Sequence, residues 1–362
     1  MLQKRIVLPP RFDNSLEPLG LIQHFLHHPP EGFETVVSAI GQPGFLAKFD
    51  LLTTADEKTL RLIDTLPGAS VMRRVLTWRT LFWGTTVTEY VPIPSEITGA
   101  ALVESMLTTW QRSSRLLILK DIPDQSPILT TTEQAAAAEL TEACKQAGFI
   151  LIAGQALAYL SIDFASQDEY LSRLSYARRK DIRRKMRIRA DLQIEMIHTG
   201  CERLNDAAFL NELYDLYLNV YMQSDIHFDK LTAEFFAAVF KDQSLDGHLF
   251  LYYSADTLIG FNLCFVHNGM LIDKYVGFRY PAARTYNLYF VSWMENLAFA
   301  LSQKLTHYIA GWTDPEIKAY LGAKFTFTRH AVYVRNPLLR YGLGKFSSHF
   351  EHDKAWFEEH QR

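Results

Sequence analysis

Residues 248–280 read HLFLYYSADTLIGFNLCFVHNGMLIDKYVGFRY. Aliphatic and aromatic residues fill three runs, which is typical of β-strands. Two pairs of turn-forming residues, Ala-Asp at 255–256 and Asn-Gly at 268–269, separate the runs. Because two-residue turns join neighbouring antiparallel strands, this stretch predicts a three-stranded antiparallel sheet.

The residues around these strands predict further helices and strands. Upstream, the pattern predicts a basic helix within 171–190, a strand at 192–200 and helices at 206–223 and 231–241. Downstream, it predicts an amphipathic helix over Tyr286–Gln303, a strand at 306–312, a short helix started by Asp314 and Pro315 and stopped by Gly322, and a last strand at 324–336. The order is therefore strand, two helices, three antiparallel strands, helix, strand, helix and strand.

The first 160 residues predict a separate layer of strands and helices. Strands are expected at 33–40, 44–52, 76–94, 116–123 and 149–162. Helices are expected at 95–114 and at 130–148, where Thr131 and Gln134 have the spacing of a capping box. This mixture of strands and helices indicates an α/β arrangement rather than a helical bundle.

The length of the chain predicts more than one domain. It has 362 residues, and single hydrophobic cores stop growing at roughly 250–300 residues. We therefore predict an α/β (α+β) protein with a first domain at 1–162, a second at 163–336 and a tail at 337–362. Hydrophobic residues make up 48% and charged residues 21% of the sequence, a balance that excludes a disordered chain.

Cysteine usage and hydropathy bear on the cellular compartment. Cys144, Cys201 and Cys264 are far apart and form no CxxC or Cys-His spacing, so neither a disulfide framework nor a metal site is expected. The opening residues, MLQKRIVLPPRFD, carry charges and prolines where a signal peptide has an apolar core. The uncharged stretch Thr257–Ile272 is too short to span a bilayer. These features predict a cytoplasmic protein without an integral membrane segment.

The charge of the chain is strongly uneven. The formal net charge is -3, yet residues 171–190 hold nine Arg or Lys and one Asp, a local excess of +8 that leaves -11 for the remainder. Such a concentration indicates one contact with an anionic partner, either a tRNA or a carrier protein, although it also fits a solvated helix face. Arginine pairs well with phosphate, and the candidates are Arg178, Arg179 and Arg183.

Residues 191–336 reproduce the element order of the GNAT acyltransferase fold, and the chain resembles that superfamily. More narrowly, four segments resemble the Fem-type, peptidoglycan-biosynthesis-like acyltransferases: LSYARRKDIRRKMR, DKYVGFRY, NLYFVSWMENLAFA and AGWTDPEIKAYLGAKF. The spacing from Gly277 through Lys318 to Gly322 is the most specific part. The resemblance implies tandem GNAT-like domains, each a mixed, mainly antiparallel sheet flanked by helices.

The resemblance also implies where a donor binds. In GNAT enzymes the fourth and fifth strands separate and the acyl arm inserts between them; here those strands would be 270–280 and 306–312. The residues then expected to bind the donor are Tyr275, Gly277, Arg284, Thr285 and Asn287. The segment PAARTYN (281–287) lacks the glycines that let a pyrophosphate approach the backbone. This departure fits the aminoacyl-tRNA donor of Fem-type enzymes, while acyl-CoA or an acyl-carrier protein stays open as cosubstrate. No tightly bound cofactor is expected.

Three residues are candidates for catalysis. Asp273 interrupts an apolar strand, where a carboxylate can take the proton of an attacking amine or can form an ion pair with a neighbouring strand. Lys318 lies in the run KAYLG, and the resemblance implies that it stabilises the carbonyl oxygen, although most helix lysines only face solvent. His227 lies in the loop between two helices and can act as a base or as a surface residue.

Together these features predict an N-acyltransferase that moves an acyl group from a thioester donor to an amine acceptor. Two alternatives stay open. One is an aminoacyl-tRNA-dependent transferase acting on a cell-wall precursor. The other is a noncatalytic GNAT-like module that binds an anionic carrier or RNA through residues 173–189, with a steep salt dependence.

Overall fold

The computed structural model describes residues 8–50, 77–110, 114–224 and 227–336. The chain divides into two compact units. The first comprises Met1–Ser15, Gly32–Ala156 and Thr326–Arg362, and the second comprises Leu16–Glu31 and Leu157–Phe325. A single boundary near residue 162 was expected, but the chain passes between the units at four points. The expected tail at 337–362 lies outside the described residues.

The first unit is built on a mixed sheet. Its strands, in spatial order, are β2 (Glu34–Val37), β3 (Pro43–Asp50), β4 (Thr77–Trp83), β6 (Leu116–Asp124), β13 (Lys324–Val334) and the first half of β7 (Ile150–Ser161). The pairs β2–β3, β3–β4 and β6–β13 are antiparallel, and β4–β6 is parallel. A small ladder joins β1 (Phe12–Asp13) to β5 (Ile93–Pro94). The longer extended segment expected at 76–94 is therefore two strands.

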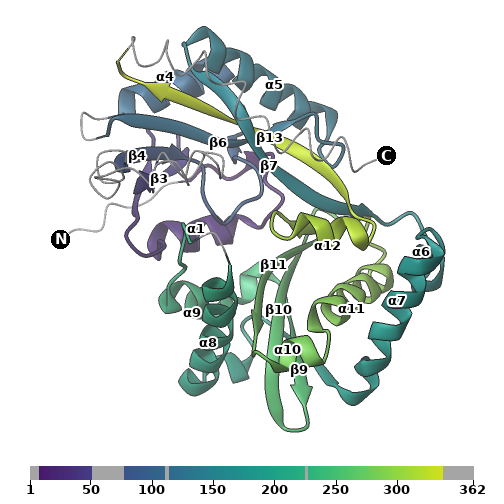
Figure 1. Cartoon of the computed structure of the whole chain (residues 1–362). Coiled ribbons are helices and arrows are strands. Elements are labelled where there is room, and N and C mark those ends of the chain that lie inside the picture. The colour runs from purple at the N-terminus through teal and green to yellow at the C-terminus, as the bar shows by residue number, and fades with distance from the viewer. Residues whose placement is uncertain (1–7, 51–76, 111–113, 225–226, 337–362) are drawn as a thin grey trace, which may run out of the picture. The chain divides into compact units, whose positions relative to one another are not determined.

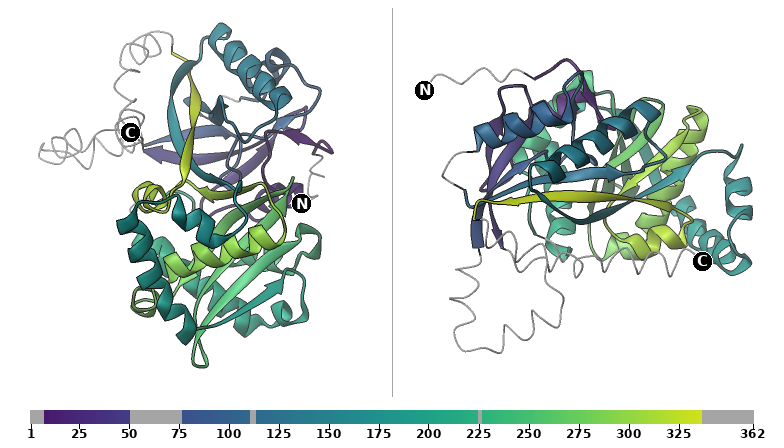
Figure 2. Two further views of the ribbon diagram at one scale, coloured as in Figure 1. Left: turned by 90° about the vertical axis from the view of Figure 1, so that its right-hand side faces the viewer. Right: turned by 90° about the horizontal axis from the view of Figure 1, so that it is seen from above.

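Within the described part of this unit, two helices cover the sheet. Helices α4 (Gly99–Thr109) and α5 (Thr131–Gln146) run side by side (Figure 2), and their apolar faces form one core with β4 and β6. The capping box of α5 uses Thr130 and Glu133, one residue earlier than the predicted pair of Thr131 and Gln134. The Glu133 carboxylate accepts from the Thr130 N–H at 2.9 Å. A charged acceptor at this position is stronger than the amide of Gln134, which explains the shift.

The second unit has its own mainly antiparallel sheet. From the second half of β7, the spatial order is β12 (His307–Gly311), β11 (Met270–Phe278), β10 (Thr257–His267), β9 (Gly247–Ser254) and β8 (Gln193–His198). Strands β8 to β11 form antiparallel pairs, which confirms the three strands predicted from 248–280. Asn268 and Gly269 have φ of 49° and 73°, as the predicted two-residue turn requires.

Helices cover both faces of this second sheet (Figure 1). Against one face lie α1 (Leu19–His27), α8 (Ala207–Gln223) and α9 (Ala233–Lys241). Against the other lie α6 (Gln167–Ser172), α7 (Tyr176–Met186) and α11 (Leu288–Ser302), which share a core with the strands. Two short helices, α10 (Ala282–Thr285) and α12 (Pro315–Tyr320), precede α11 and β13, and single 3-10 turns span 187–191, 202–205 and 243–245. Each unit is thus a mixed, mainly antiparallel sheet with flanking helices, as predicted.

The assignment of the last strand differs from the prediction. Sequence analysis placed 324–336 in the second domain, but residues 327–334 of β13 pair with β6 of the first unit. In return, residues 158–161 of β7 pair with β12 of the second unit. The residue pattern predicts that a segment is a strand, but partner choice depends on contacts far apart in sequence. The exchange was therefore not readable from the residues.

Candidate active site

Strands β11 and β12 separate part-way along their length. They pair in parallel over only three positions, from Met270 with His307 to Ile272 with Ile309. Beyond Ile272, β11 continues to Phe278 along β10, whereas β12 ends at Gly311. The predicted separation of these two strands is confirmed. It begins at Asp273, beyond which no described strand pairs with this edge of β11.

Asp273 lies at the start of this opening and accepts three hydrogen bonds. Asn262 Nδ2 donates to Oδ1 at 2.6 Å, and the Tyr308 hydroxyl donates to Oδ2 at 2.7 Å. Asn296 Nδ2 donates to the same Oδ2 at 3.1 Å. The three donors come from β10, β12 and α11, so three elements fix the direction of one carboxylate.

The donors of this network are fully buried. Asn262 and Asn296 are 0% exposed, and Tyr308 is 1% exposed. Burial raises the pKa of Tyr308 well above its ordinary value, and the charge of Asp273 adds to this, so the phenol stays protonated and donates. Buried amides without partners would each cost about 1–3 kcal/mol, which makes the carboxylate a structural requirement of the network.

Cys264 lies beside the network as a thiol. Its sulfur donates to Asn262 Oδ1 at 3.3 Å. Burial raises the pKa of Cys264 well above its ordinary value, and the Asp273 charge acts in the same direction. Because the thiolate is the nucleophilic form, this burial argues against Cys264 as a nucleophile.

A β-bulge separates Asp273 from the residues that follow it. Asp273 faces Cys264 and Tyr275 faces Leu263, so Lys274 is the extra residue of β11. Lys274 Nζ lies 3.1 Å from Glu17 Oε1, and both side chains are buried. Lys274 therefore forms an ion pair in this strand, and both carboxylate oxygens of Asp273 accept from neutral donors.

Lys318 is a buried lysine in α12. It is only 4% exposed, so the alternative of a solvent-facing helix lysine is wrong. Lysine is rarely buried this far. A Cβ added to Gly311 would lie 3.8 Å from Lys318 Nζ and 3.9 Å from the Asp273 carbonyl oxygen. The ammonium group is therefore at the end of β12, beside the backbone of Asp273. Asp314 holds the N-cap position of α12 in a left-handed conformation without a side-chain capping bond, and Pro315 follows at the first turn, as predicted.

The segment before α11 has little capacity to hold a pyrophosphate. The N–H groups of five consecutive residues, Ala283 to Asn287, donate to main-chain carbonyls between Arg279 and Arg284. Anion sites of the GNAT kind need such N–H groups to be available. The segment is therefore closed on itself by its own hydrogen bonds.

The five predicted donor-binding residues lie on β11 and in this segment. A Cβ at Gly277 would fall against the Phe261 ring and 2.9 Å from the Leu216 backbone, so the glycine lets α8 pack closely. The Tyr275 ring contacts Phe235 and Phe236, with centroids 6.0 and 5.2 Å away. The other three are positioned as follows: Arg284 stacks over Tyr280, Thr285 donates to the Pro281 carbonyl, and Asn287 precedes α11 with φ of 48° and no capping bond.

Helix α7 presents a basic stripe to solvent. We define this stripe as Tyr176, Arg179, Lys180, Arg183 and Arg187, whose spacing places them on one side of the helix, away from the buried Ile182. Tyr176 is 70% exposed. Lys180 and Arg187 form no ion pair within the described chain, whereas Arg183 pairs with Asp168 at 2.9 Å in a solvent-exposed contact.

The three predicted anion contacts are thus unequal. Arg183 and Arg179 belong to the stripe, and Arg179 also stacks on Tyr176. Arg178 turns away to α12, where it stacks over Tyr320 and donates to the Ala319 carbonyl at 3.3 Å. Lys180 and Arg187 were not predicted as contacts from the sequence. Only the helix geometry shows that they lie on the same side of α7 as Arg183.

Comparison with known families identifies the chain. Residues 98–359 match the model of the FemAB-like family, described as peptidoglycan biosynthesis/recognition. The chain belongs to the FemAB-like family. This confirms the resemblance seen in the sequence. A comparison with curated protein sequences found no match.

Solved structures with a similar fold include members of related groups. The C-terminal domain (DUF2156) of a protein from Agrobacterium fabrum, assigned as a lysylphosphatidylglycerol synthetase, has a TM-score of 0.51 at 12% identity, over 88% of this chain and 89% of that one. FemX has a TM-score of 0.49 at 10% identity, over 90% and 97%. A tandem GNAT protein from clavulanic acid biosynthesis has a TM-score of 0.44 at 13% identity, over 91% of each chain.

The remaining catalytic candidate of this FemAB-like chain, His227, lies apart from the network. It is exposed in the loop between α8 and α9, and its ring packs against Tyr221 at 5.0 Å. Within the described residues it makes no hydrogen bond or ion pair. None of the described helices is long and apolar enough to cross a membrane.

Sequence analysis missed the three donors to Asp273. Asn262 and Asn296 each stand alone among apolar residues, in LIGFNLCF and WMENLAFA. A lone amide in a run that is otherwise buried must find a hydrogen-bond partner inside the protein. That signal was available in the sequence for both asparagines, whereas Tyr308 looks like any buried aromatic residue.

Proposed function

We propose that the second unit is an N-acyltransferase that moves an aminoacyl group from a tRNA to an amine. One observation carries the proposal: where β12 stops pairing with β11, a buried lysine, Lys318, lies near the backbone of Asp273, whose carboxylate is oriented by side-chain hydrogen bonds. An apolar opening with few fixed polar groups is the usual form of an active site. The family description supports an amine of a peptidoglycan precursor as the acceptor.

The chemistry is direct attack of the amine on the ester carbonyl. A carbon–nitrogen bond forms, the carbon–oxygen bond to the ribose breaks, and the proton lost by the amine ends on the ribose oxygen. Asp273 receives that proton first, because it is the carboxylate nearest the opening among the groups described above. The ammonium of Lys318 stabilises the negative charge that develops on the carbonyl oxygen.

Two features of the structure favour tRNA over CoA as the donor. The N–H groups of residues 283–287 already donate to the main chain, so they do not cradle a pyrophosphate. The basic stripe on α7 combines cations with an exposed tyrosine, a combination suited to a polynucleotide backbone and its bases. A thioester donor is the second candidate, because the separated strands fit any extended acyl arm equally well.

The direct test is a transfer assay with the full chain. Labelled aminoacyl-tRNA or labelled acetyl-CoA is mixed with peptidoglycan precursor peptides that carry a free amine, and acylated peptide is measured. We expect transfer from aminoacyl-tRNA, lowered by about 10²–10⁴-fold in Asp273→Asn. Transfer from acetyl-CoA alone would establish the thioester route instead. Donor binding without turnover from either donor would indicate a noncatalytic module.

A further inference from the structure

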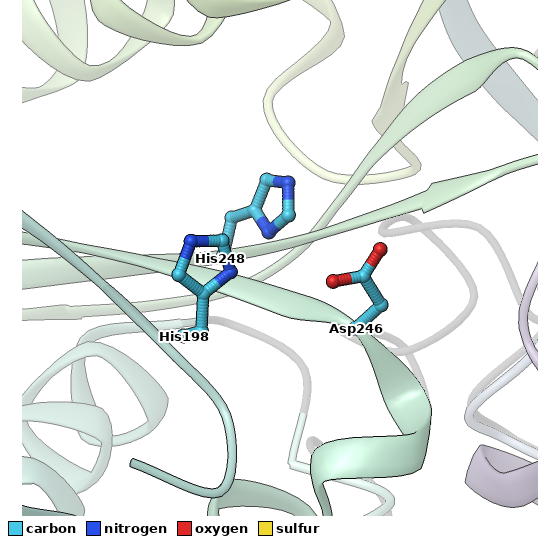
Figure 3. Close-up of side chains that lie close together, drawn as sticks. All are labelled: His198, Asp246 and His248. Atoms are coloured by element: carbon cyan, nitrogen blue, oxygen red, sulfur yellow. The ribbon is translucent and has the colours of Figure 1, made fainter.

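A second group of polar side chains lies at the β8 edge of the sheet in the second unit. His198, Asp246 and His248 each offer one ligand-type atom, and these atoms lie within 4.8 Å of one another. Figure 3 shows a ring nitrogen of each histidine on the side of the Asp246 carboxylate. None of the three takes part in the network around Asp273.

The local fold brings these residues together from distant parts of the sequence. His198 ends β8 and is the cross-strand partner of His248 in β9, with ring centroids 4.8 Å apart. Asp246 adopts a left-handed conformation with φ of 48° directly before β9, which turns its carboxylate back toward the two rings. Residues 198 and 246 are too far apart for any sequence spacing rule, which is why no metal site was expected.

His248 has an unmet hydrogen-bonding requirement. It is 7% exposed, and its Nδ1 is buried without a hydrogen-bond partner within the described residues. The ring packs edge-on against Phe299 of α11, with ring centroids 4.6 Å apart. On the side of α11 the imidazole therefore meets an aromatic ring instead of a hydrogen-bond partner. A buried polar nitrogen without a partner costs about 1–3 kcal/mol, and a bound ligand atom or metal ion would remove that cost.

We propose that His198, Asp246 and His248 form a site for a divalent transition-metal ion of the zinc class. Two imidazoles and one carboxylate are a ligand set that Zn²⁺ accepts, with a fourth position left for water, and imidazole disfavours Mg²⁺ and Ca²⁺. Ligands 2.0–2.1 Å from zinc in a tetrahedron lie about 3.4 Å apart. His198 and Asp246 are both exposed, so their side chains can rotate to close the remaining distance to the buried His248.

The expected consequence is a clamp on the edge of the sheet. A bound ion joins the end of β8 to the turn before β9, and β8 is an edge strand of this sheet. His248 in turn faces Cys264, and Cys264 faces Asp273, so the clamp lies at one end of a row of paired residues that ends at the candidate active site. Binding should therefore raise the stability of the second unit without supplying a reacting group.

The test uses full-length protein without a histidine tag, stripped with a chelator and then titrated with Zn²⁺ by calorimetry and with Co²⁺ by visible absorption. We expect one ion per chain, micromolar affinity or tighter, and a rise in melting temperature with Zn²⁺. His198→Gln and Asp246→Asn should each weaken binding by about tenfold or more. Asparagine tolerates the left-handed conformation of residue 246, so this variant keeps the turn. His227→Gln, which removes an exposed histidine elsewhere, should bind like the wild type.

Two results would overturn the site. One is the absence of saturable Zn²⁺ binding to the folded wild type. The other is binding that keeps its affinity in both His198→Gln and Asp246→Asn, which would place the ion elsewhere. Circular dichroism of each variant serves as the check on folding. Neither result depends on which acyl donor the protein uses.

Discussion

The opening at Asp273 and the basic stripe on α7 belong to the same unit but are built on opposite principles. At the opening, buried neighbours fix the direction of one carboxylate, Asp273, and one lysine, Lys318, is itself buried. On the stripe, four cations lie at the surface, and Arg183 is paired only through a solvent-exposed contact. A buried charge acts strongly on a group at one fixed position, whereas exposed charges are each weak and act together through the field that they sum to.

This contrast sets the size of the expected effects. Removing one oriented group in a water-excluded site removes an interaction that nothing replaces. Removing one exposed cation changes a summed field that salt already weakens. Variants at the opening should therefore alter turnover strongly, and variants on the stripe should alter donor affinity moderately, with the larger change at low salt concentration.

After Asp273, the largest effect is expected at Lys318. Lys318→Met keeps the length of the side chain and removes the charge from a buried position, so the fold should persist while turnover falls by about 10²–10³-fold. Single-turnover rates with aminoacyl-tRNA measure the loss. Lys324→Met, at the exposed start of β13, removes the same charge and should change little. Equal rates in the wild type and Lys318→Met would remove the lysine from the mechanism.

A smaller effect is expected on the stripe. Reversing Lys180 and Arg183 to Glu should weaken tRNA binding by about tenfold or more and lower the salt dependence by roughly two phosphate contacts. Filter binding over a range of salt concentrations measures both quantities. Reversing Lys145 and Lys241, which are exposed elsewhere, makes the same change in net charge. If this control weakens binding equally, net charge rather than the stripe accounts for the affinity.

The smallest effect is expected at Asp181, which pairs with two other cations of α7. Hydrogen bonds from Lys185 and Arg184 lower the pKa of Asp181 to about 2. A depressed carboxylate pKa stabilises the folded state above about pH 4, and this stabilisation is lost as the pH falls toward 2. Asp181→Asn should therefore cost under about 1 kcal/mol at pH 7 and almost nothing at pH 2. Urea unfolding at both pH values tests this, and an equal cost at both would mean that the charge is irrelevant.

Much of the second unit was predictable from its residues. The strands between 248 and 280 alternate with turn residues that permit few other structures, and the helices after them have clear apolar faces. Asp273 stood out as a carboxylate in an apolar strand, and the resemblance to Fem-type enzymes indicated Lys318, whose ammonium the fold places near the backbone of Asp273. Both predictions depended on local pattern, which single sequences carry well.

The parts that were missed depend on contacts between distant segments. The three donors to Asp273 come from three elements, and the exchange of β7 and β13 depends on which strands meet. The cluster of His198, Asp246 and His248 depends on strand register, since a shift by one residue would turn one histidine to the opposite face. Only the assembled sheet supplies this information.

The identity of the donor is the central question, and calorimetric titration answers it most directly. The full chain is titrated with a mixed tRNA pool, and separately with CoA and acetyl-CoA, each at two salt concentrations. We predict saturable tRNA binding that weakens at high salt, with no saturable binding of either CoA compound. Micromolar CoA binding that changes little with salt would contradict it and would show that the closed segment at 283–287 does not exclude a thioester donor.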